Sequence, residues 1–187
     1  MNLYLKRAIK YKDDFLNKAF RFYIKTIYGN SIRLNNTKFG KHFYFDIKAN
    51  QYSIVFGKNV HFRRNSTVCI REASDLQIGN NVFFNNYTSI NCHNKIIIGN
   101  DCLFGEMVKL YDHNHQYSNK NIPIATQGFS KGIIVIGDNC WIGSNVIILK
   151  NVTIGNNVII GANCLIYKDI PSNSIVKLAQ SLNQETY

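Results

Sequence analysis

Isoleucine recurs every six residues in the second half of the chain, and this period restricts the fold more than any other feature. It stands at positions 136, 142, 148, 154, 160 and 166. The fifth place of each hexad is apolar and modest in size: Cys140, Val146, Val152, Val158, Cys164 and Ile170. The fourth place holds Asn139, Asn145, Asn151, Asn157, Asn163 and Asp169. Because a helix repeats every 3.6 residues and a two-faced strand every two, the period predicts short strands separated by bends.

Each place in the hexad has a physical role in such a fold. Gly, Asn and Asp tolerate positive φ at the bends, and the isoleucines can point inward where stacked coils cover them. Stacking lets the backbone of each coil pair with the next, roughly 4.8 Å away. Three sides of six residues make one coil, so we expect Ile136 to stack on Ile154 and Ile142 on Ile160.

The same pattern extends toward the N-terminus with interruptions. Coils are expected to begin at Phe56, Ile78, Ile98, Ile136 and Ile154, at separations of 22, 20, 38 and 18 residues. The separation of 38 contains one coil and an excursion from about Asp112 to Gly132, which begins with His113 and His115. Insertions in repeat solenoids commonly lie on the binding face, so the excursion is the first place to look for a site.

The stretch CWIGSNVIILKNVTIGNNVIIGANCLIYKDIP resembles the hexapeptide-repeat acyltransferases, in particular their sugar and polysaccharide O-acetyltransferase branch. The resemblance covers about residues 50–172. It implies a mainly β fold, a left-handed parallel β-helix, and a homotrimer with active sites between neighbouring subunits. It also implies transfer of an acetyl group from acetyl-CoA to a sugar hydroxyl of a bacterial surface polysaccharide or its precursor.

Three segments are expected. Residues 49–172 form the β-helix, with the protruding loop 112–132, and residues 173–187 form a tail of unassigned role. Residues 1–48 are basic and largely helical, with eleven Lys and Arg against three Asp, which gives +8 of the net +11. Apolar residues at helical spacing predict one or two helices ending near Gly29. This segment either packs on the β-helix or another subunit, or makes a peripheral contact with a membrane surface.

Direct acetyl transfer needs a neutral base, for which histidine is well suited because its pKa lies near the working pH. In the resemblance, the L-Y-x-x-x-H pattern places the catalytic base at His115. His113 and Asp112 are candidates for orienting the base or contacting the substrate. His93, one coil earlier, either contacts the substrate or has a structural role in its turn.

Two further residues correspond to acceptor-side positions of the family. Asn85 matches the asparagine that contacts the acceptor, and an amide can both donate to and accept from sugar hydroxyls. The alternative is a turn asparagine, since this chain uses asparagine at many bends. Trp141, the only tryptophan, matches a ring beside the active-site cleft, and its alternative is a structural plug.

For acetyl-CoA, the resemblance indicates Ser144, Ala162 and Lys168. Gly143, Ser144, Gly161 and Ala162 are small, so a pantetheine arm could lie close to the backbone there. The Ser144 N–H is a candidate oxyanion donor, and Lys168 could meet a phosphate of the coenzyme. An ordinary surface lysine is the alternative for Lys168.

Other functions are weighed against this one. An N-acetyltransferase acting on a nucleotide-linked amino sugar keeps the same enzyme class. A zinc enzyme like the γ-class carbonic anhydrases, which share the fold, does not match the histidine spacing here, so no metal is expected. The basic N-terminal segment suggests a further alternative, a non-catalytic scaffold or a nucleic-acid binder. No pattern of aromatic residues for base stacking accompanies the positive charges, so no nucleic-acid partner is expected.

The expected cellular location rests on three features that the sequence does not contain. The five cysteines contain no Cys-x-x-Cys pair, which fits a reducing compartment. No run of 18 apolar residues and no secretory signal is readable. We therefore expect a cytoplasmic protein, with the basic segment as the candidate contact with the inner face of the membrane.

Overall fold

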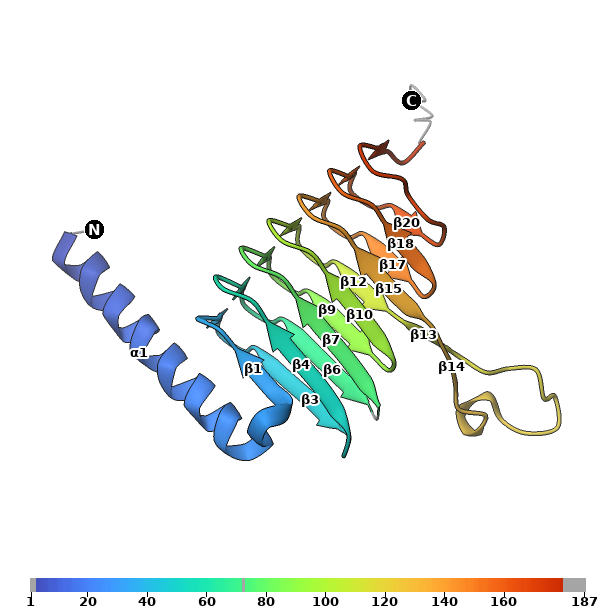
Figure 1. The fold of residues 1–187 in the computed structure, drawn as a ribbon, viewed down its shortest axis with the longest axis horizontal. Helices are drawn as coiled ribbons and strands as arrows, with labels where there is room; N and C mark the ends of the chain where they lie inside the picture. The colour runs from blue at the N-terminus through green and yellow to red at the C-terminus, as the bar shows by residue number, and fades with distance from the viewer. Residues whose placement is uncertain (1–2, 72, 180–187) are drawn as a thin grey trace, which may run out of the picture.

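The computed structural model of the protein describes residues 3–71 and 73–179. The end of the predicted tail, residues 180–187, lies outside this description. The chain winds into a three-sided prism of stacked coils, with one long helix at its N-terminal end and one arm projecting from an edge (Figure 1). Every strand of the prism pairs in parallel with the equivalent strand of the next coil.

Each side of the prism is one parallel sheet. The first face contains β1 (Ile32–Leu34), β4 (Tyr52–Phe56), β7 (Ser74–Ile78), β10 (Lys95–Ile98), β15 (Ile133–Ile136) and β18 (Val152–Ile154). The second face contains β2 (Lys38–Phe39), β5 (His61–Phe62), β8 (Phe83–Phe84), β11 (Leu103–Phe104), β16 (Trp141–Ile142), β19 (Ile159–Ile160) and β21 (Ile175–Val176). The third face contains β3 (Tyr44–Lys48), β6 (Thr67–Arg71), β9 (Ser89–Cys92), β12 (Lys109–Tyr111), β17 (Ile147–Leu149) and β20 (Leu165–Ile166). The strand β21 shows that the beginning of the predicted tail still adds a rung to the prism.

The predicted left-handed β-helix and its stacking register are confirmed. Ile136 lies on Ile154 and Ile142 on Ile160. Inside the prism the isoleucine columns continue into phenylalanines toward the N-terminus, where the rings of Phe62 and Phe84 stack at 4.4 Å. All of these side chains are buried, so the hexad isoleucines form the single apolar core of the prism.

The bends use asparagine and glycine for different reasons. Asn139, Asn145, Asn151, Asn157 and Asn163 have φ between 55° and 63°, as the pattern predicted. The glycines of the coils are not in this region. Gly143 is required because a Cβ there would lie 2.6 Å from the Ala162 backbone nitrogen of the next coil. Glycine therefore serves the close approach of successive coils, not positive φ.

The predicted end of the helical region near Gly29 is confirmed, but the segment boundary placed at residue 48 lies too far along the chain. Helix α1 spans Leu3–Tyr28, the 3₁₀ turn η1 spans Gly29–Ser31, and the first coil already begins at Ile32. The expectation that residues 1–48 are largely helical is wrong for residues 32–48. The reason is that Phe39 and Phe45 extend the apolar interior of the prism by one more coil, without the Ile-Gly hexad that marks the later ones.

Helix α1 packs on this first coil by one side. Ile24 is buried, and the Phe20 ring meets the Phe39 ring edge-on at 5.2 Å. The Asn17 side-chain oxygen accepts a hydrogen bond from the Phe39 N–H at 2.6 Å. None of the helices in the described part of the chain has the length and apolar content that a membrane crossing requires.

Candidate functional site

The excursion is an arm that leaves the prism at the edge between the third and first faces. Strands β13 (His113–His115) and β14 (Phe129–Lys131) pair antiparallel, and η2 (Ile124–Thr126) lies in the loop between them. The Gly132 N–H donates to the Asp112 carbonyl oxygen at 2.6 Å. This hydrogen bond closes the base of the arm, so the prism resumes directly where it was interrupted.

Asp112 is the buried centre of this base. Its carboxylate accepts from the His93 N–H at 2.8 and 3.0 Å and from the Asn94 N–H at 2.7 Å. One carboxylate oxygen also lies 3.2 Å from His113 Nδ1. Burial raises the pKa of Asp112, but these hydrogen bonds outweigh it and hold the pKa below its usual range. The fully buried carboxylate contacts His113, and its predicted role in orienting the base, His115, stays a prediction.

His93 and His113 stack face to face beside this carboxylate. Their ring centroids are 3.4 Å apart and the rings are 10° from parallel. Burial, together with the adjacent His113, lowers the pKa of His93 to about 4, although the Asp112 charge acts in the opposite direction. His93 is therefore neutral at neutral pH. It is buried, which fits the structural turn role better than direct contact with a substrate.

His115 lies one pleat farther out on the arm, exposed to solvent. Its ring contacts Phe129, with centroids 4.6 Å apart. The same phenylalanine meets the rings of His93 at 4.7 Å and His113 at 5.1 Å. Phe129 was not singled out in the sequence. A sequence signal for Phe129 exists: it lies three residues before Gly132, where the chain returns to the prism. A return strand that pairs antiparallel with His113–His115 brings this position opposite His115.

A second group of predicted residues lies at the edge between the second and third faces. This group contains Asn85, Gly143, Ser144, Gly161 and Ala162, which follow β8, β16 and β19 in the same turn of successive coils. The Asn85 side-chain oxygen accepts from the Asn86 N–H at 2.9 Å and from an Arg63 guanidinium nitrogen at 3.3 Å. Asn85 thus also has the turn role considered as its alternative.

Ser144 is suited to contact a bound molecule at this second edge. The Gly143 N–H pairs with the Ile160 carbonyl of the next coil, but the Ser144 N–H is not among the backbone donors that pair between coils. The Ser144 hydroxyl oxygen accepts from the Glu106 N–H at 3.3 Å. Ser144 as a whole is exposed, and its backbone nitrogen lies close to Gly105 of the preceding coil.

Trp141 lies on the outside of the second face, 56% exposed. Its neighbours above and below are Leu103 and Ile159, which are also exposed. Within this chain, Trp141 is therefore part of an outward apolar column and does not fill the core as a structural plug would.

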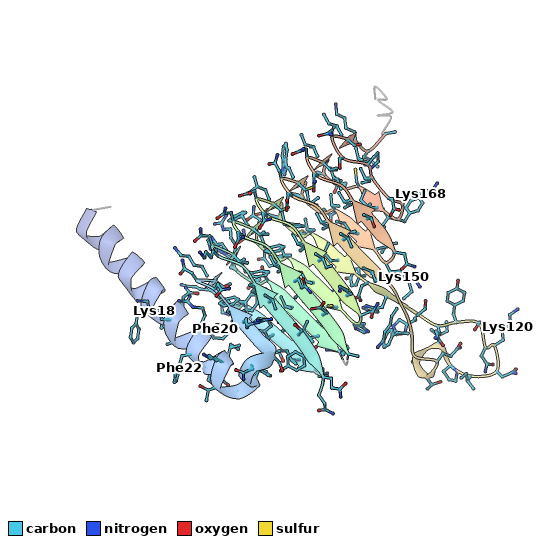
Figure 2. The ribbon with its side chains drawn as sticks, in the orientation of Figure 1. Lys18, Phe20, Phe22, Lys120, Lys150 and Lys168 are labelled. Atoms are coloured by element: carbon cyan, nitrogen blue, oxygen red, sulfur yellow. The ribbon has the colours of Figure 1, made fainter. Side chains whose placement is uncertain are left out.

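Lys168 lies on the same edge of the prism as the arm, between the third and first faces. It follows β20, one coil beyond Lys150, and both lysines are labelled on that side of the prism in Figure 2. The Lys150 ammonium contacts the hydroxyl of Ser130 on the arm. The Lys168 ammonium lies 5.7 Å from the centre of the Tyr167 ring and is exposed.

One chain does not bring all predicted residues together. Asp112, His93, His113 and His115 share one edge of the prism with Lys168, whereas Asn85 and Ser144 share another. The third face separates them by the length of β12, roughly 10 Å at about 3.3 Å per residue. Among the side chains of residues 15–71 and 73–179, no three His, Cys, Asp or Glu are arranged to hold a metal ion.

Comparisons with known proteins bear on the repeat and the fold of the chain. The family model described as bacterial transferase hexapeptide (six repeats) matches residues 133–168. The chain is 31% identical, over 57% of its length, to WbbJ of Escherichia coli K12, which is described as an O-acetyl transferase of lipopolysaccharide biosynthesis. It spans 60% of the length of that relative.

Two solved structures share the fold at low sequence identity. The N-acyltransferase AntD from Bacillus cereus, in complex with dTDP and 3-hydroxybutyryl-CoA, has a TM-score of 0.66 at 19% identity, covering 83% of this chain and 81% of that one. The hexapeptide-repeat acetyltransferase VCA0836 from Vibrio cholerae, complexed with acetyl coenzyme A, has a TM-score of 0.53 at 21% identity, covering 87% and 73%. The resemblance predicted from the six-residue period is thereby confirmed: this chain carries the repeat and the β-helical fold of the bacterial hexapeptide transferases.

Proposed function

We propose that the protein is an acetyl-CoA-dependent O-acetyltransferase that acts on a sugar hydroxyl of a bacterial surface polysaccharide or its precursor. The observation that carries this proposal is the arm. A hexapeptide β-helix is interrupted at one edge by a strand pair that holds an accessible imidazole, His115, above a buried carboxylate that fixes the base of the arm. The description of WbbJ supports the choice of an acetyl group and an oxygen acceptor.

The proposed reaction needs one proton acceptor. His115 takes the proton of the acceptor hydroxyl while the hydroxyl oxygen attacks the thioester carbonyl carbon. The carbon–sulfur bond then breaks, and the departing thiolate of coenzyme A receives the proton from the imidazolium. His115 is favoured over His113 because it is exposed, whereas the His113 side chain is only 13% exposed and one face of its ring is covered by His93.

The donor side of the proposal rests on the second edge. The small residues there allow a pantetheine arm to lie along the backbone, and the Ser144 N–H is a donor for the oxyanion. Ser144 and Ala162 are the exposed members of this group, and both have small side chains. Lys168 lies on the arm edge, from which it would supply a positive charge for a coenzyme phosphate in the trimer. AntD and VCA0836 were solved with coenzyme A thioesters bound, so acyl-coenzyme A is the class of acyl donor to test first.

A homotrimer is part of the proposal because one chain is incomplete. The histidines and Ser144 lie on different edges of the same prism, so a neighbouring chain is required to bring a donor edge beside an acceptor edge. An outward column of exposed apolar residues on the second face supports this arrangement: Leu103, Trp141, Ile159 and Ile175. A surface of this kind is typical of a face that another subunit covers.

A second candidate is N-acylation of a nucleotide-linked amino sugar, favoured by the fold shared with AntD, which was solved with dTDP. Mass spectrometry of the products, before and after mild base, separates the two. Loss of the added acetyl mass in base identifies an ester and supports the O-acetyltransferase. An acetyl mass that persists identifies an amide and assigns the second function, and no acetylated product from either acceptor class contradicts both.

A further inference from the structure

Helix α1 has a second apolar surface that the prism leaves uncovered. Phe15 and Phe22, 69% and 74% exposed, are seven residues apart and therefore lie on the same side of the helix, two turns from each other. Leu16 and Tyr23 form a parallel exposed pair. Figure 2 shows Phe20 on the side of α1 that meets the sheets and Phe22 on the opposite side. Packing on the prism therefore accounts for the inner side of α1 but not for this one.

A basic row borders this apolar surface. Lys18 and Lys25 are also seven residues apart and both are exposed, with Arg21 one turn before Lys25. The row continues into a cleft of about 730 Å³ between α1 and the first face, where Arg21, Lys25 and Arg33 meet. Phe22, Leu34 and Val55 supply apolar wall to the same cleft.

None of the residues that line the cleft is acidic. Arg21 donates to the Thr37 carbonyl oxygen at 2.6 Å, which holds its guanidinium against the first coil. Lys25 and Arg33 have no carboxylate partner within residues 15–71 and 73–179. Three cations beside an apolar wall match a ligand that carries a phosphate on an apolar body.

We propose that this outer surface of α1, consisting of Phe15, Leu16, Lys18, Phe22, Tyr23 and Lys25, docks on a membrane of anionic phospholipid, with a lipid phosphate entering the cleft. An amphipathic helix with aromatic residues beside lysines lies in the membrane interface, with its apolar side in the acyl boundary and its charges among the headgroups. A second copy of this chain is a poorer occupant, because it would place the same row of Lys18 and Lys25 against itself. The inference does not depend on the proposed acetyl transfer.

Vesicle co-sedimentation of the full chain tests the proposal. Binding is expected to vesicles that contain phosphatidylglycerol and not to pure phosphatidylcholine vesicles. The double variant Lys18→Gln/Lys25→Gln should weaken the partition coefficient by about fivefold for each charge removed. Phe15→Ser/Phe22→Ser should weaken it at least as much. The matched control Lys58→Gln/Lys177→Gln, which removes two exposed charges elsewhere on the prism, should bind like the unaltered protein.

Four outcomes of the comparison between vesicles and variants overturn the proposal, and a competition experiment adds a fifth. They are equal binding to both kinds of vesicle, an equal loss in the control variant, unchanged binding in the α1 variants, and a change of oligomeric mass in the phenylalanine variant with vesicle binding retained. The last outcome would assign the apolar surface to a second copy. Release from the vesicles by inorganic phosphate, beyond that caused by sodium chloride at equal ionic strength, would assign the cleft to a free phosphate and also overturn it. Thermal unfolding of each variant separates loss of binding from loss of fold.

Discussion

Removal of the Asp112 carboxylate tests whether the base of the arm has been correctly described. In Asp112→Ala, the N–H groups of His93 and Asn94 lose their acceptor in a fully buried place. Each unsatisfied buried donor costs about 1–3 kcal/mol, so we expect a loss of about 3–5 kcal/mol in the free energy of unfolding. A typical domain has only about 5–15 kcal/mol in total, which makes this a severe variant.

Asp112→Asn should be much milder. The carboxylate oxygen that lies 3.0 Å from the His93 nitrogen and 2.7 Å from the Asn94 nitrogen can remain as the amide oxygen. The amide NH2 then replaces the oxygen that lies 3.2 Å from His113 Nδ1 and 2.8 Å from the His93 nitrogen. His113 Nδ1 can accept its hydrogen if the ring changes tautomer, whereas the His93 N–H keeps only its longer hydrogen bond. The charge assistance and the shorter His93 bond are lost, for which we expect about 1–3 kcal/mol.

Urea unfolding at near-neutral pH and fixed protein concentration measures both variants. Asp101→Asn is the matched control, because Asp101 is an exposed turn residue whose carboxylate accepts from the Asn81 side chain at 2.9 Å. It should stay within about 0.5 kcal/mol of the unaltered protein. If Asp112→Ala costs less than about 1 kcal/mol, or if both Asp112 variants cost the same, the buried acceptor described here is wrong.

Three further predictions concern other residues. Lowering the pH from about 7 to about 5 should lower the free energy of unfolding by about 2 kcal/mol. The pKa of His93 is about 4 in the fold and near 6.5 in the unfolded chain, so the unfolded chain binds more protons over this range. Urea unfolding at a series of pH values should show this loss, and His93→Gln should remove it. Gly143→Ala, whose Cβ would lie 2.6 Å from the next coil, should lower the melting temperature more than Gly161→Ala, whose nearest contact is 3.3 Å; the reverse order would contradict the role of close coil approach. Lys168→Ala should weaken coenzyme A binding about tenfold in calorimetry, while Lys177→Ala should not, and equal affinities would refute the phosphate contact.

The stacked coils were predictable because every coil repeats the same local requirement. An inward isoleucine, a small fifth residue and a turn asparagine recur in each hexad, and the resulting partners of Ile136 and Ile142 match the observed register. The first coil was missed because its interior is built from Phe39 and Phe45 where the later hexads repeat isoleucine, although Gly40 follows Phe39 in the usual place. The six-residue period identifies only those coils that repeat the same residue types. A coil needs only apolar residues that can stack on the next coil, and other residue types also meet this need.

The internal arrangement of the arm was not predictable in the same way. The pairing of Asp112 with the His93 backbone joins residues in neighbouring coils, and it depends on where the interruption falls. The register that places Phe129 against His115 is set by antiparallel pairing in the arm, to which the hexad rule does not apply. The histidines could therefore be found by residue type and position, whereas their order of burial, from His93 to His113 to His115, required the structure.

The most direct test of the proposed acetyl transfer is the rate at which coenzyme A thiol is released from acetyl-CoA across a panel of sugar acceptors. We expect acceptor-dependent release with the unaltered chain and a rate at least about 100-fold lower in His115→Ala, since loss of a general base costs about 10²–10⁴-fold. Normal release in His115→Ala together with a comparable loss in His113→Ala would move the base to the carboxylate-linked histidine. The absence of release with every acceptor would contradict the proposed function itself.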